Sequence, residues 1–296
     1  MDNNYVKLII MHTWVSDYYK NLFGTKVYKL TFDAGCTYPT RDGTKGTRGC
    51  IFCSQSGSGE FTIPFNSDGT IIPERFKGAD TFIAYFQNYT NTYGDLKELS
   101  AKWHKALSYE GIKGLALGTR PDCLGDDVLQ ELARISENHF VQLELGFQTS
   151  NEDSALYIRR GFTNDVYFDA VKRIHEKAPK VHVVTHVIFG LPGETEEDMM
   201  NSVRAVIDAG TDGIKIMCLY VLKDTDLAVE YEQKKFEVLQ IDEYFELLKK
   251  ALRLIPPSVI IHRLSGDPPK ATLIAPQWTT DKKRVIDAVK KLTNLY

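Results

Sequence analysis

The sequence has little net charge and lacks a long apolar run. Its 296 residues carry 36 Lys and Arg against 39 Asp and Glu, which gives a formal net charge of −3. So small a charge exerts no general attraction on nucleic acid, and any such binding needs a local patch. No segment approaches the roughly 20 apolar residues that cross a bilayer. Residues 6–11 lack the flanks of a signal peptide. We therefore expect a cytoplasmic protein that does not enter a membrane.

Cysteine is also scarce, yet three of the five cysteines lie close together. Thirteen residues separate Cys36 from Cys50 and two separate Cys50 from Cys53, whereas Cys123 and Cys218 stand alone. In a reducing compartment, clustered thiols bind metal or do chemistry more often than they pair. The polar, glycine-rich stretch 37–59 that holds them is too long for an ordinary connection, which favours a functional loop.

Three thiolates leave one coordination position of a metal centre open. A four-iron cluster offers that position to a substrate or cofactor, whereas a structural zinc site closes it with a fourth protein ligand. His12 and His104 are the candidates for such a ligand. Three unrelated thiols are the remaining interpretation, so spacing alone leaves the kind of site open.

Short β-branched runs alternate with segments of helical period along most of the chain. This alternation predicts parallel strands with helices packed outside them, and we expect a partial (βα)6-type TIM barrel. Its functional residues should follow the carboxyl ends of the strands. We expect residues 1–24 to form an amino-terminal extension, 25–225 the barrel core and 226–296 a carboxyl-terminal extension. Strands are predicted at 26–32, 81–85, 114–117, 141–145, 181–189, 213–217 and 259–264, and helices at 96–108, 126–138, 165–177, 195–209, 241–254 and 281–295.

The cysteine loop and several strand ends carry a family resemblance. The run Gly49-Cys50-Ile51-Phe52-Cys53-Ser54 and the segment 186–194, which ends in Gly-Leu-Pro-Gly-Glu, resemble the YhcC/YtqA (MnmL) family of radical S-adenosylmethionine (SAM) proteins. That family stands in the elongator-catalytic-subunit-like branch. The matching segments cover most of the chain in order: 33–44, 49–54, 57–61, 85–93, 118–124, 143–149, 160–161, 186–194 and 262–267.

One departure from the family pattern falls on the cysteine loop. In relatives the first cluster cysteine stands immediately before a Pro-Asn-Arg-Asp-Gly run. Here Tyr38 holds that place, and Cys36 lies two residues earlier. We expect the glycine-rich loop to let Cys36 reach the same iron; the alternative is a two-cysteine site with impaired cluster binding.

The resemblance implies two cofactors and a set of residues to hold them. A 4Fe-4S cluster would be bound by Cys36, Cys50 and Cys53, with SAM chelating the open iron. Phe52 would touch adenine, Gln148 the ribose and Arg160 the carboxylate. The remaining cofactor candidates are the segment Gln87, Asn88, Thr90 and Asn91, for the methionine amino group, together with Glu144 and His186.

Further polar residues are candidates for substrate contacts. Arg120 and Asp122 fit either such a contact or a structural ion pair, and Cys123 is a candidate hydrogen-atom donor. His262, Arg263 and Asp267 are candidates for binding an anionic substrate.

The resemblance implies a radical SAM enzyme that modifies tRNA. Its reaction would convert a carboxymethylaminomethyl group at carbon five of the wobble uridine to an aminomethyl group. A flavodoxin or ferredoxin would supply electrons. Two alternatives stay open: a radical SAM enzyme with another substrate, and a non-catalytic, metal-stabilised RNA-binding protein.

Overall fold

The computed structural model describes residues 12–54, 62–65 and 76–293. Its main feature is a sheet of eight parallel strands in the order β2-β1-β3-β4-β5-β6-β7-β9. The strands are β1 (Tyr28–Asp33), β2 (Ile63–Pro64), β3 (Phe82–Phe86), β4 (Ile112–Thr119), β5 (Phe140–Gln148), β6 (His182–Phe189), β7 (Gly213–Cys218) and β9 (Ile260–Arg263). Within the described residues β2 and β9 do not pair with each other. The α/β barrel is therefore partial, as the sequence predicts.

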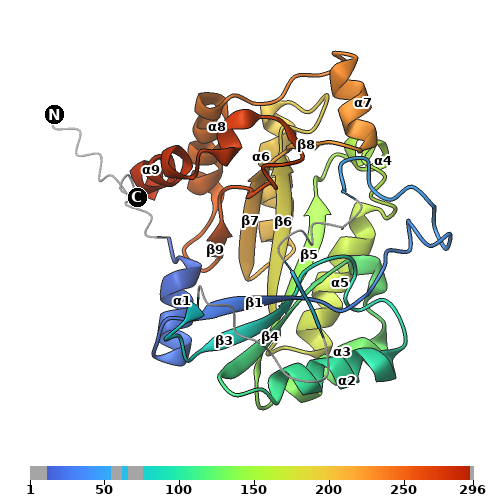
Figure 1. Cartoon of the computed structure of the whole chain (residues 1–296), viewed down its shortest axis with the longest axis vertical. Helices are drawn as coiled ribbons and strands as arrows, with labels where there is room; N and C mark the ends of the chain where they lie inside the picture. Colours follow the sequence, from blue (N-terminus) through green and yellow to red (C-terminus); the bar gives the residue numbers. More distant parts are fainter. Residues whose placement is uncertain (1–11, 55–61, 66–75, 294–296) are drawn as a thin grey trace, which may run out of the picture.

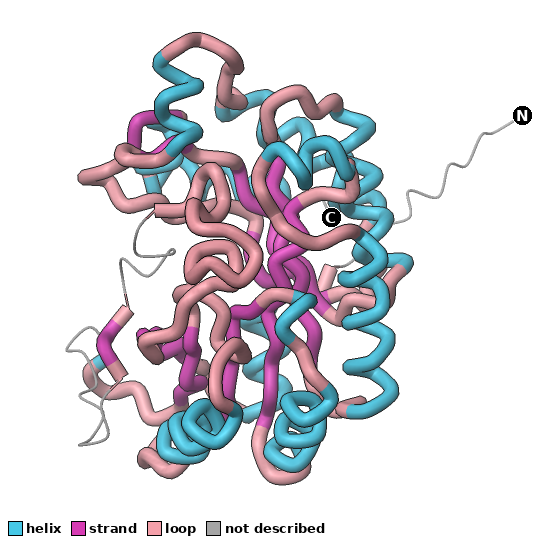
Figure 2. The backbone as a smooth tube through the Cα atoms, turned by 90° about the vertical axis from the view of Figure 1, so that its right-hand side faces the viewer, coloured by secondary structure: helices cyan, strands magenta, loops and turns pink. Residues whose placement is uncertain are grey.

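Helices cover the outside of the sheet. The crossover helices are α2 (Leu96–Leu107), α3 (Asp126–Ser136), α5 (Asn164–Lys177), α6 (Glu196–Asp208) and α8 (Ile241–Leu254). Figure 1 shows them around the fanned strands. Figure 2 shows helices along one side of the strands and loops along the other. Helix α6 begins with a capping box, in which the side chains of Thr195 and Asp198 accept from each other's backbone N–H groups.

Alternation along the strands separates the core from the barrel interior. Leu30, Leu115 and Leu143 belong to the large apolar cluster that also includes residues of the outer helices. Their neighbours Lys29 and Glu144 line an internal cavity instead. Because successive side chains of a strand point to opposite faces, the same strands build a dry core outside and a polar chamber inside.

The shorter elements lie at the two ends of the chain and in its loops. Helix α1 (Val15–Phe23) packs on β9, and Trp14 pairs with Ile261. The others are α4 (Glu152–Tyr157), α7 (Asp226–Glu232), α9 (Lys282–Thr293), the antiparallel pair β8 (Val221–Leu222) and β10 (Leu273–Ala275), and the 3-10 turns Pro121–Cys123 and Gln277–Thr280. No described helix is long and apolar enough to span a membrane.

Candidate functional site

A cavity of about 840 Å³ runs through the interior of the partial barrel. One end, which we call the mouth, is lined by the cysteine loop and by residues at the carboxyl ends of the strands, such as Gln87 and Gln148. The other end, the floor, is lined by Lys29, Glu144 and Lys215 from within the strands. Helix α1 also contributes to the cavity wall, through Val15, Ser16 and Tyr19.

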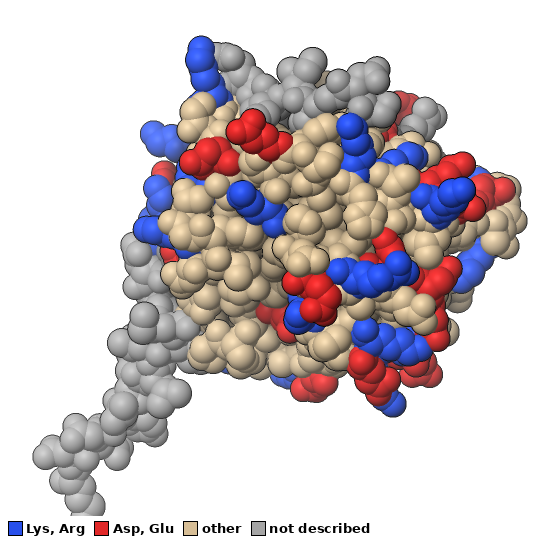
Figure 3. Space-filling model, turned by 90° about the horizontal axis from the view of Figure 1, so that it is seen from below, with Lys and Arg blue, Asp and Glu red and all other residues tan. Residues whose placement is uncertain are grey.

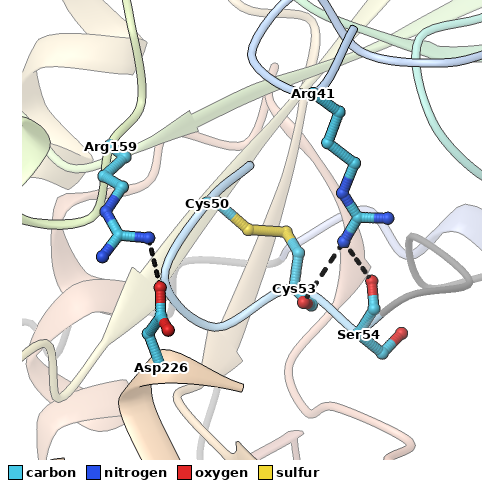
Figure 4. The surroundings of a disulfide bond; sticks show 6 residues. All are labelled: Arg41, Cys50, Cys53, Ser54, Arg159 and Asp226. Carbon is cyan, nitrogen blue, oxygen red and sulfur yellow. Dashed lines mark hydrogen bonds and ion pairs between the residues drawn. A yellow bond between two sulfur atoms is a disulfide. The ribbon is translucent and has the colours of Figure 1, made fainter. Parts of the chain in front are cut away.

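Two cysteines of the predicted cluster face the mouth. Cys50 and Cys53 both line the cavity, their Cα atoms are 5.4 Å apart, and their sulfurs form a disulfide (Figure 4). Phe52, between them, lines the cavity as well. The pair therefore supplies two adjacent sulfur atoms and one aromatic face to the same space.

Backbone and charged contacts hold the cysteine turn against its surroundings. Ile51 N–H donates to the carbonyl of Ile158, at 3.2 Å, and the Ile51 carbonyl accepts from Leu227 N–H at 3.0 Å. Arg41 Nη2 donates to the Ser54 carbonyl at 2.6 Å, and Figure 4 shows it reaching across the loop. Gly49 adopts a φ of +68°, and a Cβ there would lie 2.9 Å from Arg41 Nε. The turn thus needs glycine at this place.

The third predicted ligand is elsewhere in the structure. Cys36 packs against the large apolar cluster and does not line the cavity; burial raises the pKa of its thiol, which lies near Lys102 and Asp33. Tyr38 lines the mouth instead, with its ring 5.2 Å from that of Tyr89. No described group of three or more His, Cys, Asp or Glu side chains is arranged to hold a metal ion. The structure therefore brings two of the three predicted sulfur ligands together.

The zinc interpretation requires a fourth ligand at the same place. His104 instead contacts Glu131 at 2.8 Å between α2 and α3, outside the cavity. His12 also does not line the cavity. Neither histidine closes a site on the cysteine pair.

Side chains of the loop after β3 lie in two places, some in the cavity wall and others in the protein interior. Gln87 lines the mouth, whereas Asn88, Thr90 and Asn91 are buried and do not. Asn91 Nδ2 bonds the carbonyls of Phe86, Asn88 and Gly118, so this residue fixes the ends of β3 and β4. The side-chain oxygens of Asn88, Thr90 and Asn91 have no hydrogen-bond partner among the described residues. Three buried acceptors therefore remain unused beside the mouth.

Two predicted cofactor residues, Gln148 at the end of β5 and Arg160 in the segment after it, offer different groups to a ligand. Gln148 lines the mouth in the left-handed region, with a φ of +66°, which is uncommon for a residue with a side chain. Arg160 is 3% exposed, and its guanidinium donates to three backbone carbonyls and to Glu152 and Asn164. Because an arginine has five N–H donors, all are used within the protein. Arg160 holds the loop after β5 rather than offering a free donor to a cofactor carboxylate.

The floor is organised around one buried carboxylate. Glu144 Oε1 accepts from Lys29 at 2.8 Å and from Gln142 at 2.7 Å. Its Oε2 accepts from Tyr85 and Lys215 and lies 2.9 Å from His186 Nε2. Glu144, a predicted cofactor residue, therefore lies inside the barrel, but its oxygens are occupied by protein groups.

The charges on the floor do not cancel. Burial opposes the Glu144 charge, but Lys215 and Lys29 hold the pKa of its carboxyl well below the ordinary value. Burial also opposes the charge of Lys29, but Glu144 raises its pKa above the ordinary value. For Lys215, burial and the Lys29 charge lower the pKa to about 8. Burial lowers the pKa of His186, which favours its neutral form. One carboxylate thus balances one of two ammonium groups.

The three residues predicted to bind an anion also line this cavity. His262 Nε2 forms a hydrogen bond with His182 Nε2 at 3.0 Å, and burial lowers the pKa of His262 well below the ordinary value. A Cβ at Gly213 would lie 2.6 Å from the His262 ring, so only glycine leaves room for it. Arg263 lines the cavity, and Asp267 pairs with Lys282 at 3.2 Å.

Arg120 and Asp122 form the ion pair that the sequence left as one of two possibilities. Arg120 Nε and Nη2 donate to the two Asp122 oxygens at 2.9 Å each, and Lys45 adds a second cation. Arg120 lines the cavity, whereas Asp122 and Cys123 do not. Burial raises the pKa of the Cys123 thiol to about 12, so the group stays protonated. The structure gives Cys123 no direct access to the cavity.

Sequence inspection missed the two floor lysines. Lys29 and Lys215 lie on β1 and β7, far apart in the chain, and only the barrel brings both to Glu144. The available signal was a lysine within an otherwise apolar strand, as in Gly213–Cys218, because an unpaired charge is rarely placed there.

Comparisons with known proteins agree with this fold. The radical SAM superfamily model matches residues 43–206, and the radical SAM C-terminal domain model matches residues 211–294. "Uncharacterized protein YtqA" of Bacillus subtilis is 38% identical, over 91% of this chain and 85% of that protein. "Protein YhcC" of Escherichia coli is 33% identical, over 88% of this chain and 85% of that protein.

More distant matches include a tRNA-modifying enzyme and a solved structure. A tRNA-2-methylthio-N(6)-dimethylallyladenosine synthase of Leifsonia xyli is 27% identical over 40% of this chain and 22% of that protein. The structure of Methanocaldococcus infernus Elp3 superposes with a TM-score of 0.58 at 16% identity, over 72% of this chain and 55% of that one. From the family models and the full-length relatives, this chain belongs to the radical SAM superfamily.

Proposed function

We propose that this protein is a radical SAM enzyme that acts on the wobble uridine of tRNA. It would convert a carboxymethylaminomethyl group at carbon five to an aminomethyl group. The observation that carries the enzyme class is the mouth of the cavity, where Cys50, Cys53 and Phe52 face the strand-end residues Gln87 and Gln148. The cavity lies inside the partial barrel, and this position also suits radical chemistry, because a radical must be kept from water.

Members of the superfamily use a 4Fe-4S cluster and SAM. When bound, the cluster supplies the electron that cleaves SAM to a 5′-deoxyadenosyl radical. The residues of this chain fit the cofactors in part. Once their disulfide is reduced to two thiolates, Cys50 and Cys53 would hold iron. Phe52 offers a face for adenine, and Gln87 offers a side-chain oxygen to an ammonium group. A third sulfur ligand is missing from the mouth, where Tyr38 stands.

The tRNA substrate rests on weaker support. A tRNA-modifying enzyme is among the distant relatives. The basic residues of the cysteine loop are engaged within the protein, since Lys45 pairs with Asp122 and Arg48 pairs with Asp226. On the face shown in Figure 3, acidic and basic side chains are interspersed. That face therefore offers RNA no broad basic surface, and we propose that an RNA contact is local and centres on the cavity.

Two measurements test the proposal separately. Anaerobically reconstituted protein should bind iron, show a thiolate-to-iron charge-transfer band and release 5′-deoxyadenosine from SAM when reduced by flavodoxin or ferredoxin. Stoichiometric zinc without SAM cleavage would contradict the enzyme class. Mass spectrometry of tRNA nucleosides from a strain that lacks the gene should show carboxymethylaminomethyluridine accumulating. An unchanged wobble-uridine profile would reject the substrate and leave the enzyme class standing.

A further inference from the structure

We infer that the floor of the cavity is a binding site for a single carboxylate of the substrate, held by Lys29 and Lys215. The inference rests on the proposed function in one respect: that function identifies the carboxylate as the one on the carboxymethylaminomethyl group of the uridine, which we call the arm. The site itself is argued from the contacts and charges of the floor.

The two ammonium groups are fixed in position by the protein. Lys29 and Lys215 approach different oxygens of Glu144, whose side chain is 0% exposed. Gln142 also donates to Glu144 and accepts from Tyr19 at 2.7 Å, so the carboxylate is held on both sides. A site whose donors are already ordered loses little side-chain entropy when a ligand binds.

The charge of the floor calls for one more anion. Two lysines face one glutamate, and His186 is held toward its neutral form. Burial, more than any other cause, lowers the pKa of Lys215, and the neighbouring Lys29 and Arg263 charges lower it further. The two lysines exceed Glu144 by one positive charge, and Arg263 adds another cation to the cavity wall, so the chamber attracts an anionic group. The carboxylate of the proposed arm is such a group, and inorganic phosphate is the competing anion that the test must separate from it.

Both lysines are accessible from the cavity. Their side chains line it and keep 22% and 10% of their surface exposed, for Lys29 and Lys215 respectively. An anionic group that enters the cavity can therefore reach both ammonium groups. The carboxymethyl end of the proposed substrate arm carries the charge that this chamber lacks.

Chemical labelling of the wild-type protein tests the site without any variant. Lysines are acetylated with a trace of acetic anhydride, far below the probe concentration, so that the probe's own amine is not exhausted. The probes are N-methylglycine, which copies the ammonium and carboxylate of the arm, dimethylamine, which lacks the carboxylate, and inorganic phosphate; labelling of Lys215 relative to an exposed lysine corrects for reagent that the probe consumes. Peptide mass spectrometry then follows Lys215, with the exposed Lys172 as the internal control. We expect N-methylglycine to slow the labelling of Lys215 saturably, by about tenfold at ten times its Kd.

The outcomes of the labelling are distinct. Protection by N-methylglycine but not by dimethylamine or inorganic phosphate supports a carboxylate site. Protection by phosphate alone would overturn the assignment in favour of a phosphate, and no protection by any probe would overturn the site itself.

Binding of RNA then tests whether the site serves the proposed substrate. Anticodon stem-loops with carboxymethylaminomethyluridine or methylaminomethyluridine at the wobble position differ by one carboxylate. We expect the wild type to prefer the first by about tenfold in Kd, and K215M to lose that preference. K223M, which changes a lysine outside the cavity, should keep it. Equal wild-type affinities would overturn the link to this arm. If neither RNA binds while N-methylglycine protects Lys215, the tRNA function fails and the carboxylate site stands.

Discussion

The mouth and the floor of the cavity are built in opposite ways. At the mouth, Cys50, Cys53 and Tyr38 lie on a long loop that is tied down by a few backbone and arginine contacts. At the floor, Glu144 and its partners lie on the central strands and satisfy one another. Loops on a rigid scaffold can change without unfolding it, whereas a buried charge network cannot. The contrast suggests that cofactor binding and stability are separable in this protein.

The largest effect should come from removing a mouth cysteine. We expect Cys50→Ala to abolish iron binding after anaerobic reconstitution, because the variant keeps a single thiol at the mouth. Iron analysis and the visible spectrum measure this loss. The urea midpoint should stay close to that of wild type under reducing conditions, since the thiol contributes little to the core. Cys123→Ala is the matched control, and a comparable loss of iron there would contradict the assignment.

The second prediction concerns the floor, where a substitution should lower stability and leave iron binding intact. Glu144→Gln keeps the shape of the side chain but leaves both lysines without their counter-ion, so we expect the free energy of unfolding to fall by about 3 kcal/mol. Urea denaturation at neutral pH measures it. Iron binding by the folded protein should persist, and a variant as stable as wild type would break the contrast between mouth and floor.

Separate variants at positions 36 and 38 should change the iron content less than removal of Cys50 does. Tyr38→Cys places a third thiol at the mouth, and we expect it to raise the iron bound per chain. Cys36→Ala should leave the iron content unchanged, because Cys36 lies outside the cavity. Loss of iron in Cys36→Ala would instead show that residues near Gly35 rearrange and bring Cys36 to the cluster, as the sequence suggested.

The smallest effect concerns a single carboxyl near the mouth. Burial raises the pKa of Glu194 to about 7, and its Oε2 has no hydrogen-bond partner among the described residues. Between its unfolded pKa of about 4.5 and a pH of about 7, the folded state binds more protons, so Glu194 makes stability fall as pH rises. We expect Glu194→Gln to stabilise the protein by about 1 kcal/mol at pH 8 and by little at pH 4. Urea denaturation at both pH values measures this, and equal effects would contradict the assigned pKa.

The strands of the sheet could be predicted closely from the sequence, because short β-branched runs are a local pattern. The strand predicted at 181–189 is β6 (His182–Phe189), and the helix predicted at 241–254 is α8 with the same bounds. Helix α1 was missed because the amino-terminal segment has no N-cap side-chain bond and buries only Tyr19. Its place is set by packing on β9, which no local pattern reveals.

The site was less predictable than the fold. The spacing of Cys50 and Cys53 is a local signal, and both residues line one cavity. Arg160 fits the family pattern, but only the structure shows that its donors are all used. The floor lysines come from strands that meet only in the folded barrel, and the charge balance at Glu144 has no counterpart in the order of the residues. Part of the resemblance, 57–61, lies outside the described residues.

The glycine beneath His262 has an evolutionary consequence. Any side chain at position 213 would collide with the imidazole, so a lineage that replaces Gly213 must also give up the contact between His182 and His262. We therefore expect relatives that share this chamber to keep glycine at position 213. Relatives that keep glycine at this place, together with lysines matching Lys29 and Lys215, form the group whose substrates we expect to share a carboxylate.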